Sequence, residues 1–361
     1  MVIPYARQSI SEQDLNAVAE VLQSDYLTQG PVVPAFEDAV AQLVGAKYAV
    51  AGNSATSMLH VACLALGVTA GDLVWTSPIS FVASANCALY CGAEIDFVDI
   101  DSETFNMSPV ALAAKLELAK QSNTLPKVII PVHMGGQSCD MQSIGTLAKQ
   151  YGIKVIEDAS HAIGGSYNSQ RIGNCTHSDI TIFSFHPVKI ITSGEGGMAT
   201  TQDESLANKM SMLRSHGITR NESEFEFTTD GPWYYEQQEL GLNYRLTDIA
   251  AALGLSQLQR IDSFINQRNA IAARYNNAFT STQVAVPHID PNCVSAFHLY
   301  IGRYNFKNAK ISRVQLFQKM KDAGVLLNLH YIPIYRQPYF AKMGFDPKTF
   351  PNAERYYEQA F

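Results

Sequence analysis

The sequence is organised around residues 183–197, which read FSFHPVKIITSGEGG. An alternating apolar run that begins at Ile180 predicts a buried strand ending near Ser184. Lys189 follows five residues later, between valine and isoleucine side chains. Burial among such neighbours lowers the pKa of a lysine amine and makes the amine a nucleophile toward an aldehyde. The stretch predicts Schiff-base chemistry at Lys189, and the alternative is a lysine that extends from a strand end into water.

The composition is that of an ordinary globular chain. It has 361 residues, of which 47% are hydrophobic and 16% charged, enough for one large domain and a smaller one. The net charge of −7 argues against nucleic-acid and anionic-membrane partners, so we expect small-molecule partners. We expect a cytoplasmic protein with reduced cysteines, because no apolar run indicates a signal sequence or a membrane span and the six cysteines are scattered.

Strands and helices alternate along the first two thirds of the chain. Short apolar runs predict strands over 47–50, 73–75, 94–100, 127–132 and 154–157, with helices over 81–90, 109–119 and 141–151. This pattern predicts an α/β domain with a mostly parallel sheet covered by helices on both faces. We place this large domain at residues 1–245. Connecting helices and a smaller C-terminal α+β domain, with a strand over 296–304, follow at residues 246–361.

Ligands bind such sheets at the carboxyl ends of strands, and the residues found there match the needs of an aldehyde cofactor with a ring nitrogen. Lys189 supplies the amine, and Asp158, at the end of a strand, supplies the acid that keeps the nitrogen protonated. Phe81 and Ala159 are candidates for the two faces of the ring. The alternative for Phe81 is an ordinary core aromatic.

A phosphate group on the cofactor would find donors at a strand-turn-helix junction. Residues 52–56 read Gly-Asn-Ser-Ala-Thr and lead from a strand into a helix. Exposed amides and the positive end of a helix favour an anion, with the hydroxyls of Ser54 and Thr56 as further donors. Ser184 would add another hydroxyl. The alternative is a plain helix cap.

Five motifs, taken together and in order, resemble the DegT/DnrJ/EryC1/StrS family of pyridoxal-phosphate-dependent sugar aminotransferases. They are GNSAT at 52–56, EDASH at 157–161, SFHPVK at 184–189, GEGG at 194–197 and NYRLTD at 243–248. The resemblance runs from about Ile3 to the C-terminus and implies the type I aminotransferase fold. Shorter segments resemble the pseudaminic-acid branch of the family; they lie at 24–31, 185–189, 214–220 and 330–333.

The resemblance implies roles for individual residues. Lys189 and Asp158 would be catalytic, and pyridoxal 5'-phosphate would be held by Ser54, Ala55, Thr56, Phe81, Asp158, Ala159, His161, Ser184, Lys189 and Asn243. Asn243 would reach the phosphate of the neighbouring subunit, which implies a homodimer with shared active sites. The nucleotide sugar would contact Tyr5, Tyr26, Leu27, Thr28, Gln29, His186, Asn328, His330 and Tyr331. We add Arg245 as a candidate for binding an anionic group, with a structural ion pair as the alternative.

The implied reaction moves an amino group from L-glutamate to the 4-keto carbon of a UDP-linked 4-keto-6-deoxy-N-acetylhexosamine, with ping-pong kinetics. Another UDP-linked or dTDP-linked keto sugar is an alternative substrate, and a non-catalytic cofactor-binding or sensor module is the alternative of another class. Lys189 argues against the family subset that removes oxygen with a histidine in its place. A Rossmann dehydrogenase would need a glycine fingerprint that no early strand carries. The chain stops at Phe361, where the family continues with another strand and helix, so truncation is an alternative to a complete small domain.

Overall fold

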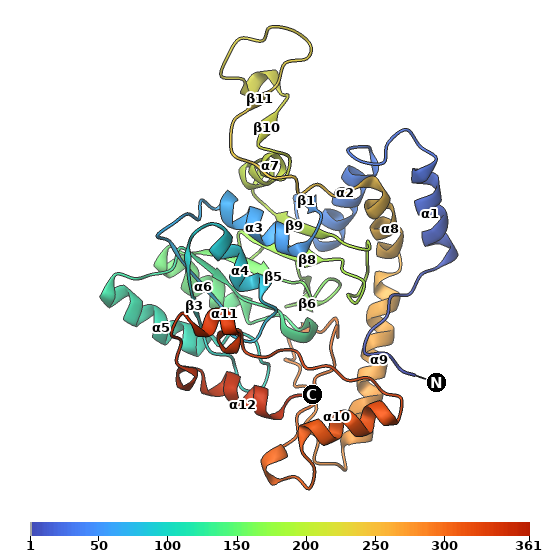
Figure 1. The fold of residues 1–361 in the computed structure, drawn as a ribbon, viewed down its shortest axis with the longest axis vertical. Helices are drawn as coiled ribbons and strands as arrows, with labels where there is room; N and C mark the ends of the chain where they lie inside the picture. The colour runs from blue at the N-terminus through green and yellow to red at the C-terminus, as the bar shows by residue number, and fades with distance from the viewer. Residues whose placement is uncertain (1) are drawn as a thin grey trace.

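The fold is built on a seven-stranded mixed sheet with helices on both faces (Figure 1). Residues 2–361 are described by the structure, a computed structural model. The strand order is β1-β9-β8-β5-β4-β2-β3. The strands are β1 (Tyr48–Gly52), β2 (Leu73–Thr76), β3 (Glu94–Phe97), β4 (Val128–Ile130), β5 (Lys154–Asp158), β8 (Ile180–Ser184) and β9 (Gly197–Thr201). From β3 to β8 the neighbours are parallel, and β9 is antiparallel to both β8 and β1, which confirms the mostly parallel sheet.

The remaining elements are helices and the short strands of two smaller sheets, β10-β11 and β12-β6-β7. The helices are α1 (Glu12–Leu22), α2 (Val32–Val44), α3 (Ala55–Ala65), α4 (Ala83–Tyr90), α5 (Pro109–Ser122), α6 (Met141–Tyr151), α7 (Glu204–Leu213), α8 (Asp248–Leu258), α9 (Ile261–Phe279), α10 (Arg313–Asp322), α11 (Pro338–Ala341) and α12 (Pro351–Gln359). The short strands are β6 (Ser166–Tyr167), β7 (Gln170–Arg171), β10 (Ile218–Thr219), β11 (Glu236–Gln237) and β12 (Cys293–Val294).

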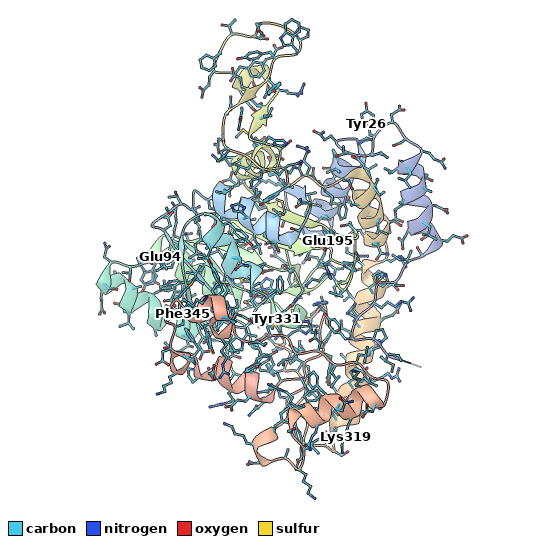
Figure 2. The ribbon with its side chains drawn as sticks, in the orientation of Figure 1. Tyr26, Glu94, Glu195, Lys319, Tyr331 and Phe345 are labelled. Carbon is cyan, nitrogen blue, oxygen red and sulfur yellow. The ribbon has the colours of Figure 1, made fainter. Side chains whose placement is uncertain are left out.

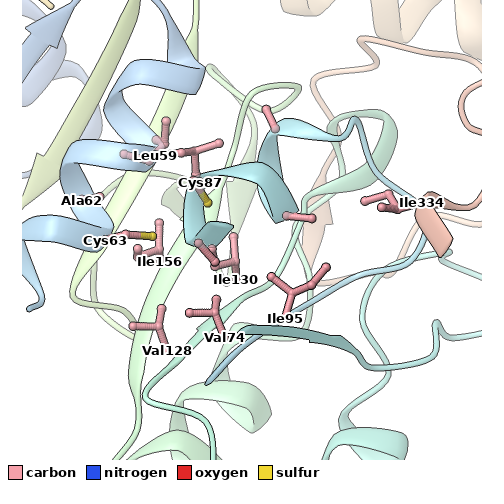
Figure 3. Close-up of a cluster of buried hydrophobic side chains, with 14 of the residues drawn as sticks. Leu59, Ala62, Cys63, Val74, Cys87, Ile95, Val128, Ile130, Ile156 and Ile334 are labelled. Carbon is pink, nitrogen blue, oxygen red and sulfur yellow. The ribbon is translucent and has the colours of Figure 1, made fainter. Parts of the chain in front are cut away.

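Both faces of the central strands are apolar, as expected for a covered parallel sheet. On β4, Val128 and Ile130 belong to a cluster that includes side chains of α3 and α4, whereas Ile129 belongs to a cluster with side chains of α5 and α6. On β5, Ile156 joins the first cluster and Val155 the second. Figure 3 shows the first cluster, in which side chains of α3 and α4 meet those of the strands. Because successive side chains of a strand point to opposite faces of the sheet, Asp158, two residues after Ile156, lies on the same face as Ile156, toward α4.

The N-terminal helix begins with a capping box, which the sequence Ser11-Glu12-Gln13-Asp14 predicts. Ser11 Oγ accepts the amide hydrogen of Asp14 at 3.3 Å, and the Asp14 carboxylate accepts that of Ser11 at 2.8 Å. The same carboxylate, fully buried, also accepts hydrogen bonds from Ser256 and Gln257 of α8. The sequence motif therefore caps α1 and ties it to α8.

The strand predicted over 296–304 is wrong. Apart from an isolated bridge at Arg303, the segment is irregular. Its backbone amides donate to the turn at residues 134–136 instead: Ala296 N to Gly136 O at 2.9 Å and Leu299 N to Gly135 O at 3.1 Å. The segment has the composition of a strand, but the backbone beside it is a turn. Its amides therefore donate to the carbonyl oxygens of that turn. The domain boundary near residue 245 stays a prediction.

Residues 218–237 form an arm that projects from the body of the molecule (Figure 1). The short strands β10 and β11 pair at its base. The sequence predicts an irregular loop for residues 221–235, over the site or at a subunit contact, and the arm carries exposed aromatic side chains at Phe227, Trp233 and Tyr235. Exposed aromatic side chains are typical of contact surfaces, and both positions expected for this loop, over the site or at a subunit contact, stay predictions.

Candidate active site

A cavity of about 710 Å³ lies where several strands of the sheet end. Asp158 ends β5, Ser184 ends β8, and residues 53–57 follow β1. These carboxyl ends share one edge because β1, β5 and β8 run in the same direction. The lining includes many of the residues expected from the sequence: Tyr5, Ser54, Ala55, Thr56, Phe81, Asp158, His161, Ser184, His186, Lys189, Asn328, His330 and Tyr331.

Lys189 lies in this cavity with its amine largely removed from water. Burial lowers the pKa of Lys189 to about 8 from its ordinary value of 10.5, and the negative charge of Asp158 acts in the opposite direction. An amine with such a pKa is partly unprotonated near neutral pH. It is therefore available as a nucleophile or as a base, as the apolar neighbours in the sequence predict.

Asp158 is held by a chain of hydroxyl groups that sequence reasoning missed. Ser84 Oγ donates to Asp158 Oδ2 at 2.6 Å, and Ser80 Oγ lies 2.7 Å from Ser84 Oγ. The amide of Ser160 donates to Asp158 Oδ1 at 3.1 Å. All three side chains of this chain are buried. The only signal in the sequence is a serine among small residues on a helix that follows a strand.

The junction after β1 has the donors that a phosphate requires. Ser54 caps α3 by accepting the amide hydrogen of Ser57 at 3.0 Å, which leaves the amides of Ala55 and Thr56 without an acceptor within residues 2–361. Gly197 allows β9 to pass directly beneath, since a Cβ there would lie 2.5 Å from the Ala55 nitrogen. With the hydroxyl of Ser184 opposite, this junction fits a phosphate monoester.

The two predicted ring contacts differ in position. Phe81 lines the cavity and is 58% exposed, so its face is available to a flat ligand. Ala159 does not line the cavity, because it is buried in the apolar cluster that also contains Phe183 and Phe185. His161, two residues further, lines the cavity instead.

Two imidazoles that pack against each other, with their rings tilted, line the cavity. The rings of His161 and His298 have centroids 4.4 Å apart, and in each ring a buried Nδ1 has no partner in the described part of the chain. His161 Nε2 lies 3.0 Å from the hydroxyl of Tyr331. Burial and the positive charge of Lys189 hold the pKa of both histidines well below its ordinary value, so both are neutral. His298 has no sequence motif around it that points to a site.

Residues from the N-terminal and C-terminal parts of the chain also line the cavity. Tyr5 Oη lies 3.1 Å from His330 Nε2, and the two rings have centroids 5.2 Å apart. Burial, together with the Lys189 charge, lowers the pKa of His330 to about 4. Figure 2 shows Tyr331 near the centre of the molecule, whereas Tyr26 lies at its outer edge.

Several predicted contacts lie outside this cavity. Residues 26–29 and Asn243 are exposed and do not line it. Residues 26–29 lie beside the start of α8, because Asp248 N donates to Leu27 O at 3.0 Å and Thr28 forms a bridge with Thr247. Arg245 does not line the cavity either, and its guanidinium donates to Ser215 Oγ at 3.1 Å. The contact with an anionic group that we expected for Arg245 stays a prediction.

Comparison with known proteins agrees with this geometry. Residues 8–361 match the DegT/DnrJ/EryC1/StrS aminotransferase family. The chain belongs to this family. It is a pyridoxal-phosphate-dependent sugar aminotransferase with the type I aminotransferase fold, which sets aside the alternative of a non-catalytic module.

Two bacterial proteins are similar to this chain over almost its whole length. The spore coat polysaccharide biosynthesis protein SpsC of Bacillus subtilis is 39% identical over 99% of this chain and 90% of its own length. The UDP-4-amino-4,6-dideoxy-N-acetyl-beta-L-altrosamine transaminase of Campylobacter jejuni is 36% identical over 99% of this chain and 90% of its own length.

Solved structures of family members have the same fold. Helicobacter pylori PseC, an aminotransferase involved in the biosynthesis of pseudoaminic acid, has a TM-score of 0.89 and 30% identity over the whole of this chain and 92% of its own. The PLP form of the putative sugar aminotransferase Spr1654 from Streptococcus pneumoniae has a TM-score of 0.88 and 28% identity, with the same coverage. The cavity residues of this family member fit pyridoxal phosphate, because an amine, an acid and a set of phosphate donors surround a space of suitable size.

Proposed function

We propose that this aminotransferase transfers the amino group of L-glutamate to the 4-keto carbon of a UDP-linked 4-keto-6-deoxy-N-acetylhexosamine. The products would be 2-oxoglutarate and UDP-4-amino-4,6-dideoxy-N-acetyl-β-L-altrosamine. The observation that carries the reaction type is the partly unprotonated Lys189 beside Asp158 in a cavity with phosphate donors. The altrosamine transaminase among its relatives supports the sugar.

Each residue has a proposed part in holding the cofactor. Lys189 would bind its aldehyde carbon, and Asp158, fixed by Ser84, would pair with its ring nitrogen. The junction at residues 54–56 and Ser184 would bind its phosphate, and Phe81 would cover one ring face. When bound, pyridoxal phosphate stabilises negative charge on the carbon next to the transferred nitrogen.

Lys189 would also carry the protons. As a free amine its Nζ would take the proton from the α carbon of the donor, and as an ammonium it would hold that proton until it is given back. In the second half of the reaction, the same steps run in reverse and place a hydrogen and the amino group on C4 of the sugar. The neutral histidines around Lys189 add no positive charge to compete with its protonation.

A different nucleotide-linked keto sugar is the second candidate substrate. The observation that favours it is the higher identity, 39% against 36%, to a spore coat polysaccharide protein than to the altrosamine transaminase. A panel of UDP-linked and dTDP-linked 4-keto and 3-keto sugars, each incubated with glutamate, separates the two. We expect 2-oxoglutarate to form with the UDP-linked N-acetyl sugar, and NMR of the product to show the amine at C4. Turnover confined to another sugar would contradict the proposed substrate.

Lys189→Ala tests the reaction itself. We expect the variant to lose turnover while its far-ultraviolet circular dichroism stays unchanged, because the side chain that moves the protons is absent. Borohydride reduction of the wild-type holoenzyme should leave a pyridoxyl group on Lys189. Transamination by Lys189→Ala at the wild-type rate would refute the assignment.

Two wider features of the protein remain proposals. We propose a homodimer whose active sites include Asn243 of the neighbouring chain, which would account for the exposure of Asn243 outside its own cavity. A cytoplasmic location is the other proposal. None of the helices described within residues 2–361 has the length and apolar character to cross a bilayer.

A further inference from the structure

Ser84 places a hydroxyl group in a fully buried position beside Asp158. It is the second residue of α4 and is 0% exposed, and its neighbours in the sequence, Ala83 and Ala85, are both buried alanines. A buried hydroxyl costs free energy unless it has a hydrogen-bond partner, and a third alanine would fill almost the same space without that cost. The Oγ of Ser84 donates to Asp158 Oδ2 at 2.6 Å, so its partner is the acid of the proposed active site.

The bond to Asp158 takes precedence over the bond that a helical serine commonly makes. In a helix, a serine hydroxyl often donates to the carbonyl oxygen three or four residues earlier. That acceptor is available, because Ser84 Oγ lies 3.4 Å from the carbonyl oxygen of Phe81. The carboxylate is closer, at 2.6 Å, and its charge makes it the stronger acceptor. The single hydrogen of the Ser84 hydroxyl is therefore directed to Asp158.

A second hydroxyl extends this bond to the wall of the active-site cavity. Ser80 Oγ lies 2.7 Å from Ser84 Oγ. Because the hydrogen of Ser84 is used by Asp158, Ser80 is the donor in this pair. Ser80 lines the cavity, whereas Ser84 lies behind the lining. Hydrogen bonds in such a chain polarise and strengthen one another, so Ser80 supports the bond that Ser84 makes.

The backbone holds the other oxygen of the same carboxylate. The amide of Ser160 donates to Asp158 Oδ1 at 3.1 Å. Each oxygen of Asp158 thus has one donor from the protein, and each keeps a free lone pair, since a carboxylate offers about four acceptor positions. Rotation of the carboxylate would break both bonds. Asp158 therefore faces the cavity in a fixed orientation, with capacity to accept a further hydrogen bond.

We propose that Ser84, supported by Ser80, is a positioning residue that holds the charged carboxylate of Asp158 in place for the ring nitrogen of pyridoxal phosphate. Hydrogen bonds donated to a carboxylate favour its charged form, and a charged carboxylate keeps the ring nitrogen protonated. A protonated ring is the stronger electron sink for the carbon at which Lys189 would act. The role of Ser84 rests on the proposed pairing of Asp158 with the ring nitrogen, and it is independent of which sugar is the substrate.

Two forms of the cofactor test this role by binding alone. Pyridoxal phosphate carries the ring nitrogen, and its deaza analogue has a carbon atom in that place. Titration of the cofactor-free protein should give a dissociation constant for pyridoxal phosphate about tenfold higher in Ser84→Ala, because the pair with Asp158 loses its supporting hydrogen bond. The constant for the deaza analogue should change by less than about twofold, because this analogue forms no hydrogen bond to Asp158 in either protein. An equal loss for both forms would mean that Ser84 only maintains the shape of the cavity, and would overturn the proposal.

Two further variants grade and control the effect. Ser80→Ala should weaken the binding of pyridoxal phosphate in the same direction but only about threefold, because it acts through Ser84. Ser77→Ala is the matched control. Ser77 is also buried and precedes the same helix, but its hydroxyl bonds only to the backbone of Ile79, at 3.3 Å. Its replacement should leave the affinity for both forms of the cofactor unchanged, and a loss equal to that of Ser84→Ala would contradict the proposal.

The visible absorbance of the holoenzyme gives an independent measure. It changes with pH as the nitrogen that joins Lys189 to the cofactor loses its proton, and positive charge on the ring favours that loss. With less charge on the ring, the midpoint of the change should rise in Ser84→Ala by about half a pH unit or more. With the deaza analogue the midpoint should be the same in the variant and the wild type. A midpoint that does not move with pyridoxal phosphate would contradict the role of Ser84.

The outcome is separable from that of the proposed function. If the wild type binds pyridoxal phosphate and the deaza analogue equally well, Asp158 does not pair with the ring nitrogen, and the proposed pairing itself fails. If the wild type prefers pyridoxal phosphate and Ser84→Ala keeps that preference, the pairing stands and only the role of Ser84 fails. Neither measurement requires turnover of a sugar.

Discussion

Lys189 is a half-buried amine, and the loss of water around its charged form costs the folded chain stability. Its pKa of about 8 lies below the ordinary value of 10.5, so the folded state disfavours the protonated form. Other site residues take their positions from the ends of strands. Asp158 and Ser184 are the last residues of β5 and β8, Ser54 lies just after β1, and the carboxyl ends of these strands open into the cavity. For these residues the sequence is informative, since strand ends in a parallel sheet meet at one edge.

Lys189→Met is predicted to stabilise the cofactor-free protein. At pH 7 the free energy of unfolding should rise by about 2–3 kcal/mol, because the variant no longer holds a charge away from water. The penalty in the wild type is fully present below pH 8, where the folded chain must protonate the amine. It is lost between pH 8 and 10.5, where only the unfolded chain binds the proton. Urea unfolding at pH 7 and at pH 10.5 measures both values, and equal stability of the two proteins at pH 7 would contradict the prediction.

Asp248 shows how one element can cap another that is distant in sequence. It is the first residue of α8 and fully buried, yet its carboxylate accepts the amide hydrogens of Gly30, Val32 and Val33 at 2.9, 2.9 and 3.4 Å. These amides belong to the start of α2, where Pro31 offers no side-chain cap. The negative charge also suits the positive end of α2.

Asp248→Ala should therefore destabilise the protein by about 2–4 kcal/mol, since it leaves buried amides without an acceptor. Thr247→Ala, which removes the ordinary cap of α8 by deleting the acceptor for the Ala250 amide, should cost only about 1 kcal/mol. Urea unfolding followed by circular dichroism compares the two. Equal losses would mean that the carboxylate of Asp248 does not stabilise α2.

At the scale of the whole molecule, the exposed residues 26–29 lie beside the start of α8, outside the cavity of their own chain. Residues 26–29 and 243–247 are linked by the backbone contacts of Leu27 and Thr28. The arm at residues 218–237 projects beyond the body of the molecule (Figure 1) and carries exposed aromatic side chains. A neighbouring subunit that receives these surfaces is the proposal that they support.

Subunit mixing tests this proposal. Lys189→Ala and Asn243→Ala are co-expressed with different tags, and the mixed dimers combine both defects in one site and leave the other intact. With random pairing, half of the dimers are mixed, so activity should return to roughly a quarter of the wild-type value. Co-expression of Lys189→Ala with the Lys189→Ala and Asn243→Ala double variant is the control and should restore nothing. Recovery absent from both mixtures would place Asn243 outside a shared site.

Local patterns in the sequence determined the strand and helix order, the capping box at Ser11 and the lysine beside an acid. Each depends on near neighbours in the chain or on the rule that parallel strands end together. The tertiary structure alone decided that Ser84 holds Asp158, that His298 packs against His161, and that the segment 296–304 bonds to a turn rather than a strand. These residues come from remote parts of the chain, and their meeting depends on how packed elements place them, which no local periodicity encodes.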